Sequence, residues 1–136
     1  MLVNDKGKVM TIVGDVDAEN RNIGVYKKNG KVGQTWDIIY VDEMPADLKK
    51  GDLNKDWGMI IEEPFYVISN LPTGRYLDVI GRNMVIKTRN GFPSQEWYFH
   101  QQSRTIKNKK NNLSWDIQNA GKTTNMQTWN TNSGWF

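Results

Sequence analysis

The sequence has no cysteine and a single histidine among its 136 residues. The missing cysteine excludes disulfide bridges, thiol nucleophiles and cysteine-based zinc sites. His100 follows three aromatic residues on an expected strand and belongs to no recognisable local catalytic motif. Residues 15–20 alternate oxygen-bearing side chains but lack the full pattern of a calcium loop. We therefore expect no enzyme, no cofactor and no metal site.

Long hydrophobic runs are also absent. No apolar run approaches the roughly 18 residues that span a bilayer, and residues 1–5 lack the basic and apolar regions of an export signal. A chain of this length forms one domain that buries roughly two-thirds of its unfolded surface. We expect a soluble domain without a membrane span. The sequence does not determine the cellular compartment, nor whether the chain is part of a longer or tandem-repeat protein.

The net charge of +3 is not gathered into one basic track. The densest basic cluster is Lys107, Lys109 and Lys110, between two strand-like segments. This composition is typical of a solvated hairpin tip. Aromatic residues are not interleaved with the cluster, as binding to single-stranded nucleic acid requires. Nucleic acid is therefore not an expected partner.

Apolar residues occur in short segments rich in Val, Ile, Tyr and Trp, separated by turn residues at fairly even intervals. This spacing predicts an all-β sandwich or barrel rather than alternating strands and helices. The exception is the segment 44–61, which has the polarity of a short helix. The expected strands are 8–13, 24–26, 36–41, 65–68, 76–80, 84–86, 97–99, 115–117 and 126–129.

One motif occurs twice in the chain. Asn29-Gly30 begins seven positions before Trp36, and Asn90-Gly91 begins seven positions before Trp97. A Gln lies two positions before each Trp, so both copies predict a turn, a polar loop and a strand that opens with Gln-x-Trp. A shortened third copy ends at Trp135. The chain is therefore expected to repeat internally, with about 20 extra residues inserted at 44–61.

A second shared element precedes each Gln-x-Trp strand. Leu77-Asp78-Val79 in the middle copy aligns with Trp115-Asp116-Ile117 and with Met10-Thr11-Ile12. Together the two elements resemble the ricin-type β-trefoil lectin family, with its ricin B-like Gln-x-Trp repeat. The resemblance covers the chain outside the insertion and implies a single all-β trefoil of three pseudo-repeats with four strands each. The implied boundaries are 1–136 for the domain, 1–43 for repeat one, 44–61 for the insertion, 62–102 for repeat two and 103–136 for an incomplete repeat three.

In that family the repeated Trp is mainly structural. Three rings pack around the pseudo-three-fold axis, and the Gln helps to hold the loop. The resemblance therefore places Trp36, Trp97 and Trp135 in the core. This role suits a large apolar ring that needs one hydrogen-bond partner.

The resemblance also implies one possible sugar pocket in each repeat. An Asp accepts hydrogen bonds from sugar hydroxyls, an aromatic ring stacks on the pyranose, and Asn or Gln side chains complete the contacts. Repeat three matches this pattern best. Asp116 provides the carboxylate, Gln127 and Trp129 form a Gln-x-Trp pair with the ring as platform, and Asn132 is an amide donor.

The pocket of repeat two is expected to be weak. It keeps Asp78 and Gln95, but Lys87 replaces the aromatic ring and Val85 replaces the pairing Gln. A pocket without a ring has no platform on which a sugar can stack.

Repeat one departs from the pattern in the opposite way. It has Tyr26 as ring and keeps Gln34, but Thr11 replaces the carboxylate and Gly24 replaces the pairing Gln. Because the strongest acceptor is lost, this pocket is also expected to be weak.

Two functions remain open at this stage. The first is a lectin module for galactose or N-acetylgalactosamine on glycans or glycoproteins, extracellular or appended to a larger protein. The second is a degenerate trefoil that acts as a protein interaction or scaffold module, binding other domains of a longer chain or assembly. Asp116 and Asp78 could instead cap their own turns, and Trp129 could be a cross-strand packing residue.

Overall fold

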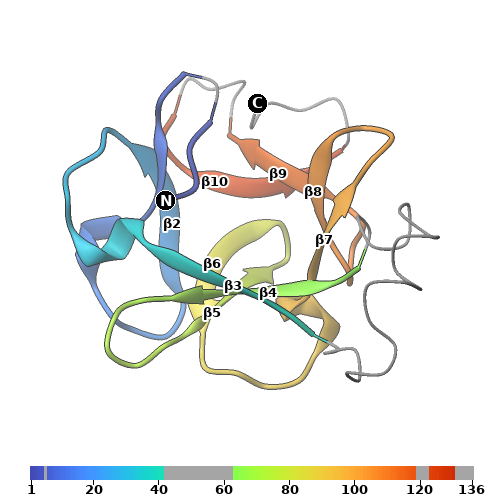
Figure 1. The fold of residues 1–136 in the computed structure, drawn as a ribbon, viewed down its shortest axis with the longest axis horizontal. Coiled ribbons are helices and arrows are strands. Elements are labelled where there is room, and N and C mark those ends of the chain that lie inside the picture. The colour runs from blue at the N-terminus through green and yellow to red at the C-terminus, as the bar shows by residue number, and fades with distance from the viewer. Residues whose placement is uncertain (5, 42–62, 119–122, 131–136) are drawn as a thin grey trace, which may run out of the picture.

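The structure is a computed structural model that describes residues 1–4, 6–41, 63–118 and 123–130 (Figure 1). The described residues form strands and short 3-10 helices, which confirms the all-β class. None of these helices is long and apolar enough to cross a membrane.

The insertion 44–61 lies outside the described residues. The elements are β1 (Val9–Ile12), η1 (Val13–Asp15), β2 (Arg21–Tyr26), η2 (Val32–Gln34), β3 (Trp36–Tyr40), β4 (Phe65–Ser69), β5 (Tyr76–Ile80), β6 (Asn83–Lys87), η4 (Pro93–Gln95), β7 (Trp97–His100), β8 (Thr105–Asn108), β9 (Ser114–Ile117) and β10 (Met126–Trp129).

The strands divide into a barrel-like wall and three hairpins. Strands β3, β4, β7 and β8 pair in that order, each antiparallel to the next, and form the wall. The hairpins are β1–β2, β5–β6 and β9–β10, one from each expected repeat. The second strands of the hairpins meet, because β2 pairs with β6 and β6 pairs with β10 (Figure 1). A bridge also joins Gly24 to Asn125. The three repeats therefore surround a common axis.

An asparagine marks the same place at the start of each of these second strands. The Nδ2 of Asn83 donates to Oδ1 of Asn22 at 3.0 Å, and the Nδ2 of Asn125 donates to Oδ1 of Asn83 at 2.9 Å. Each asparagine is followed by a fully buried apolar residue of the core, which is Ile23, Met84 or Met126. A chain of side-chain amides thus links the three repeats directly at the axis.

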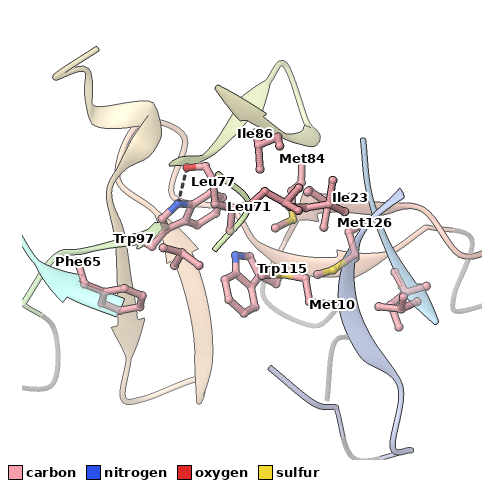
Figure 2. Close-up of a cluster of buried hydrophobic side chains, with 14 residues drawn as sticks. Met10, Ile23, Phe65, Leu71, Leu77, Met84, Ile86, Trp97, Trp115 and Met126 are labelled. Atoms are coloured by element: carbon pink, nitrogen blue, oxygen red, sulfur yellow. Dashed lines mark hydrogen bonds between the residues drawn. The ribbon is translucent and has the colours of Figure 1, made fainter. Parts of the chain in front are cut away.

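The core beneath the hairpins is built around two tryptophan rings (Figure 2). Trp97 is fully buried, as expected, and its Nε1 donates to the carbonyl of Leu77 at 3.1 Å. Its ring meets the buried ring of Trp115 edge to face, with centroids 5.9 Å apart. Trp115 takes the place that Leu77 and Met10 hold in the other repeats, so repeat three places a much larger side chain in the core.

The other two tryptophans expected in the core differ from Trp97. Trp36 is only partly buried and packs against the edge of the core, although its Nε1 donates to the carbonyl of Met10 at 3.1 Å. That bond is the repeat-one counterpart of the bond from Trp97 to Leu77. Trp135 lies outside the described residues.

The basic segment near residue 107 is not entirely a hairpin tip, so that part of the expectation was wrong. Lys107 and Asn108 belong to β8, which pairs with β7, and both residues are buried. The Nδ2 of Asn108 donates to the carbonyl of Ser94 at 2.8 Å. The turn begins at Lys109, which with Lys110 is exposed. Nζ of Lys107 donates to the carbonyl of Asn112 at 3.4 Å, so this buried lysine is used within the chain.

The acidic stretch considered for calcium joins repeat one to repeat two. Asp17 and Glu19 form ion pairs with Arg75 at 2.5 and 2.9 Å. The backbone N–H of Thr73 donates to Asp17, while the N–H and hydroxyl of Thr88 donate to Glu19. These carboxylates are therefore used within the chain, and we call this network the inter-repeat clasp. Within the described ranges, no three His, Cys, Asp or Glu side chains are grouped to hold a metal ion.

The clasp changes the acidity of its members. Hydrogen bonds from Thr73, assisted by Arg75, lower the pKa of Asp17. Hydrogen bonds from Thr88, again assisted by Arg75, lower the pKa of Glu19. The hydrogen bond to Glu19 is the main reason that the pKa of Arg75 is raised. All three shifts favour the charged forms, so the clasp is strongest when both carboxyls are ionised.

We predict that the clasp stabilises the fold at neutral pH but not in acid. A carboxyl whose folded pKa lies below its unfolded value stabilises the protein above the unfolded pKa. This stabilisation is lost as the pH falls through the folded pKa, which for Asp17 and Glu19 lies below the ordinary carboxyl value. The double variant Asp17→Asn/Glu19→Gln should melt a few degrees below the parent at pH 7, and the gap should close as the pH is lowered.

Thermal unfolding followed by circular dichroism from pH 7 to pH 2.5 measures this gap. Glu96→Gln, a substitution at a carboxylate outside the clasp, is the control and should show no comparable pH-dependent gap. A gap of constant size over the whole pH range would contradict an electrostatic role for the clasp.

Candidate functional site

The two Asn-Gly turns have the same geometry in repeats one and two. Gly30 and Gly91 have φ angles of 75° and 76°, a backbone region that favours glycine. The side chain of Asn29 accepts from the N–H of Lys31, and that of Asn90 accepts from the N–H of Phe92. These local bonds explain why the dipeptide recurs at this point of the repeat.

The Gln of each Gln-x-Trp motif braces the loop that precedes it. The Oε1 of Gln95 accepts from the N–H of Asn90 at 3.0 Å, and its Nε2 donates to the carbonyl of Thr88 at 2.9 Å. In repeat one, Gln34 makes the same two contacts with Asn29 and Lys27, both at 2.8 Å. In repeats one and two the loop is thus held by one buried amide.

In repeat two, the same glutamine also donates to Asp78, the carboxylate considered for sugar binding. Nε2 of Gln95 donates to Oδ2 of Asp78 at 3.1 Å, and the N–H of Val79 donates to Oδ1 at 2.6 Å. Only 1% of Asp78 and none of Gln95 is exposed. The geometry therefore engages both side chains in support of the loop.

Repeat one has a ring but no carboxylate beside it. The hydroxyl of Thr11 stands in the position of Asp78 and accepts from Nε2 of Gln34 at 3.2 Å. Tyr26 is 37% exposed, but its ring leans over Gly24, where an added Cβ would lie 2.8 Å from ring carbon Cε2. The Tyr26 hydroxyl accepts from the Thr124 hydroxyl at 3.3 Å. The structure thus places Tyr26 against repeat three rather than beside an acidic acceptor.

Repeat three arranges its carboxylate differently. Asp116 on β9 lies directly opposite Gln127 on β10, and Nε2 of Gln127 donates to Oδ2 of Asp116 at 2.8 Å. An amide from the adjacent strand therefore orients this carboxylate. Asp116 is 5% exposed. The pair has no counterpart in the other repeats, where Val85 and Gly24 occupy the position of Gln127.

Trp129 lies on the same face of the hairpin as this pair. Along β10, Met126 and Thr128 are buried, whereas Gln127 and Trp129 point to the opposite face. Trp129 pairs with Ser114, two residues before Asp116, and is 38% exposed. The structure thus brings three of the four expected residues of this site together. The fourth, Asn132, lies outside the described residues.

Sequence analysis missed a fifth side chain at this site. Arg82, in the turn between β5 and β6, places its guanidinium carbon 4.2 Å from the centre of the Trp129 ring. Its carbonyl accepts from the N–H of Thr128 at 2.6 Å and from the Thr128 hydroxyl at 3.3 Å. No local pattern around Arg82 reveals this contact, because it depends on how the hairpins of repeats two and three meet.

Comparison with known proteins establishes the family. The model of the ricin-type beta-trefoil lectin domain-like family matches residues 53–132, more than half of the chain. The chain belongs to this family. The match confirms the resemblance seen in the motifs, and it includes the β9–β10 hairpin with Asp116, Gln127 and Trp129.

A solved structure agrees with this assignment at the level of the fold. The crystal structure of the designed three-fold symmetric protein ThreeFoil is similar, with a TM-score of 0.71 at 15% sequence identity. The similarity covers 98% of this chain and 89% of that chain. No curated protein sequence matches this member of the ricin-type family significantly. The comparisons thus show a lectin-like β-trefoil fold.

The buried brace leads to a stability prediction. Replacing Gln95 with Ala removes three hydrogen bonds and leaves the Asn90 N–H and the Asp78 carboxylate without this partner. Loss of partners for buried polar groups should lower the free energy of unfolding by about 2–4 kcal/mol. Urea unfolding measures the change.

Gln101→Ala provides a matched control, because Gln101 is exposed in a turn. It should change the free energy of unfolding by less than about 0.5 kcal/mol. Equal effects of the two substitutions would show that the buried amide does not brace the loop.

Proposed function

We propose that this protein is a carbohydrate-binding module with one working site, in repeat three. Its ligands are glycans that carry galactose or N-acetylgalactosamine, the sugars implied by the family resemblance. The observation that carries the proposal is the Gln127–Asp116 hydrogen bond beside the exposed ring of Trp129. The other two repeats lack this combination.

The chemistry of the three side chains suits a sugar. An ionised carboxylate only accepts hydrogen bonds, so Asp116, oriented by Gln127, would receive bonds from adjacent sugar hydroxyls. Trp129 offers a flat apolar surface for the C–H face of a pyranose ring. Asn132 is proposed from the sequence as an amide donor at the edge of the same site. Binding of this kind requires neither a metal ion nor an activated nucleophile.

The contrast between the two aspartates supports this choice of repeat. Asp78 and Asp116 occupy equivalent strand positions, but Asp78 is paired with the loop amide of Gln95. Asp116 is paired with an amide that projects from the same face of the sheet as Trp129. Only in repeat three do a carboxylate, an amide and a ring share one face. A single site of this type binds weakly, so strong attachment to glycans would require tandem modules or an oligomer.

We predict that Asp116→Asn weakens binding of methyl galactoside by about tenfold or more. The substitution keeps the size of the side chain and its contact with Gln127 but removes a charged acceptor, a loss of at least about 1.5 kcal/mol. Trp129→Ala should also reduce binding, because the stacking surface disappears. Isothermal titration calorimetry on natively folded variants measures both effects.

Phe92→Ala is the control, since it removes an exposed ring from the loop of repeat two and should leave the affinity unchanged. Circular dichroism confirms that each variant is folded. If Asp116→Asn binds as tightly as the parent, the assignment of the site is wrong. If the parent binds nothing on an array of neutral and acidic glycans, the lectin proposal fails and the scaffold hypothesis takes its place.

A further inference from the structure

We propose that Arg82 makes the repeat-three site selective for acidic sugars, with a hexuronic acid as the preferred class of ligand. This inference rests on the proposed function, because it assigns a substrate class to the same site. The guanidinium that covers part of Trp129 belongs to a different repeat from the rest of the site, and no family motif predicts it.

The position of Arg82 is well defined by its backbone. Its carbonyl accepts two hydrogen bonds from Thr128, the residue immediately before Trp129. The preceding Gly81 has a φ of 61°, so the turn bends tightly at this point. The arginine is therefore anchored beside β10, and its guanidinium carbon lies 4.2 Å from the centre of the Trp129 ring.

The charge of Arg82 is available to a ligand. Among the described residues, the ion pairs within 4.0 Å all involve Arg75 in the inter-repeat clasp, so Arg82 has no carboxylate partner there. Arg82 is exposed. A guanidinium that lies over an aromatic ring can still donate from its N–H groups to a carboxylate through two parallel hydrogen bonds.

Two other cations stack on aromatic rings, and they differ from Arg82. Arg89 lies 5.7 Å from the ring centre of Tyr66, and Lys109 lies 5.6 Å from that of Tyr98. Both are farther from their rings than Arg82 is from Trp129. Neither ring lies on the β9–β10 face that carries the Asp116–Gln127 pair. Within the described part of the chain, the combination of ring, oriented acceptor and unpaired cation occurs at Trp129.

The two charged groups set opposite demands on the ligand. Asp116 repels an anion and requires neutral hydroxyl donors, whereas Arg82 favours a carboxylate. A hexuronic acid satisfies both, because its ring carries hydroxyls at one side and a carboxylate at C6. Galacturonic acid is the matched probe, since it differs from galactose only by a carboxylate in place of the C6 hydroxymethyl group. Trp129 would support the ring of either sugar.

The test compares methyl galacturonoside with methyl galactoside by calorimetry on the full chain. We expect the parent to prefer the acidic sugar by about two- to fivefold at low salt, within the range for an exposed ion pair. The preference should shrink in 0.5 M NaCl, because salt screens the interaction. Arg82→Gln should abolish the preference, and Arg82→Lys should retain part of it.

Arg89→Gln is the matched control. It removes the same charge from a different aromatic ring and should leave the preference unchanged. A preference that falls equally in Arg82→Gln and Arg89→Gln would overturn the inference, since net charge alone would explain it. Tighter binding of both sugars by Arg82→Gln would also overturn it, because Arg82 would then be a cover on the Trp129 ring.

The outcomes separate this inference from the proposed function. If the parent binds galactoside through Asp116 but shows no preference for galacturonoside, the lectin site stands and the role of Arg82 is wrong. If the parent binds neither these sugars nor any glycan on an array, the proposed function fails, and the inference fails with it.

Discussion

Three hairpins from successive repeats meet at one axis, and the contacts between repeats follow from that meeting. The second strands of the hairpins pair with one another, and the amides of Asn22, Asn83 and Asn125 form a hydrogen-bonded chain where they converge. The same arrangement brings Arg82 of one hairpin beside Trp129 of the next. It also brings Thr124 to the hydroxyl of Tyr26. A site at this end of the molecule is therefore shared between repeats.

Thr11, Asp78 and Asp116 occupy equivalent strand positions, but the glutamine that bonds to each side chain does not come from the same place in every repeat. In repeats one and two, the glutamine of the Gln-x-Trp motif holds its loop and also donates a hydrogen bond to Thr11 or Asp78. Repeat three lacks that glutamine, and Asp116 is paired instead with Gln127 on the neighbouring strand. Among the described residues, the repeat that lacks this glutamine is thus the one whose hairpin carries both a carboxylate and an exposed tryptophan.

Two arginines differ in the partners that the neighbouring repeat presents to them. Arg75 is neutralised by two carboxylates that tie repeat one to repeat two, whereas Arg82 stacks on a ring and has no carboxylate partner among the described residues. Composition and net charge do not distinguish the two, because both are single arginines beside hairpin turns. The difference lies in which side chains the neighbouring repeat presents to each.

Local patterns in the sequence were sufficient to predict the all-β class, the repeated turns, the ricin-type family and the burial of Trp97. These features depend on residues close together in the chain: Asn-Gly requires a turn, and alternating apolar residues require a strand with one buried face. They also predicted that Asp116, Gln127 and Trp129 belong together, since all three lie on one hairpin. Local sequence patterns did not predict the contacts between repeats. The brace around Asp78, the burial of Lys107 and Trp115, and the stacking of Arg82 on Trp129 arise only when strands distant in sequence pack around a common axis.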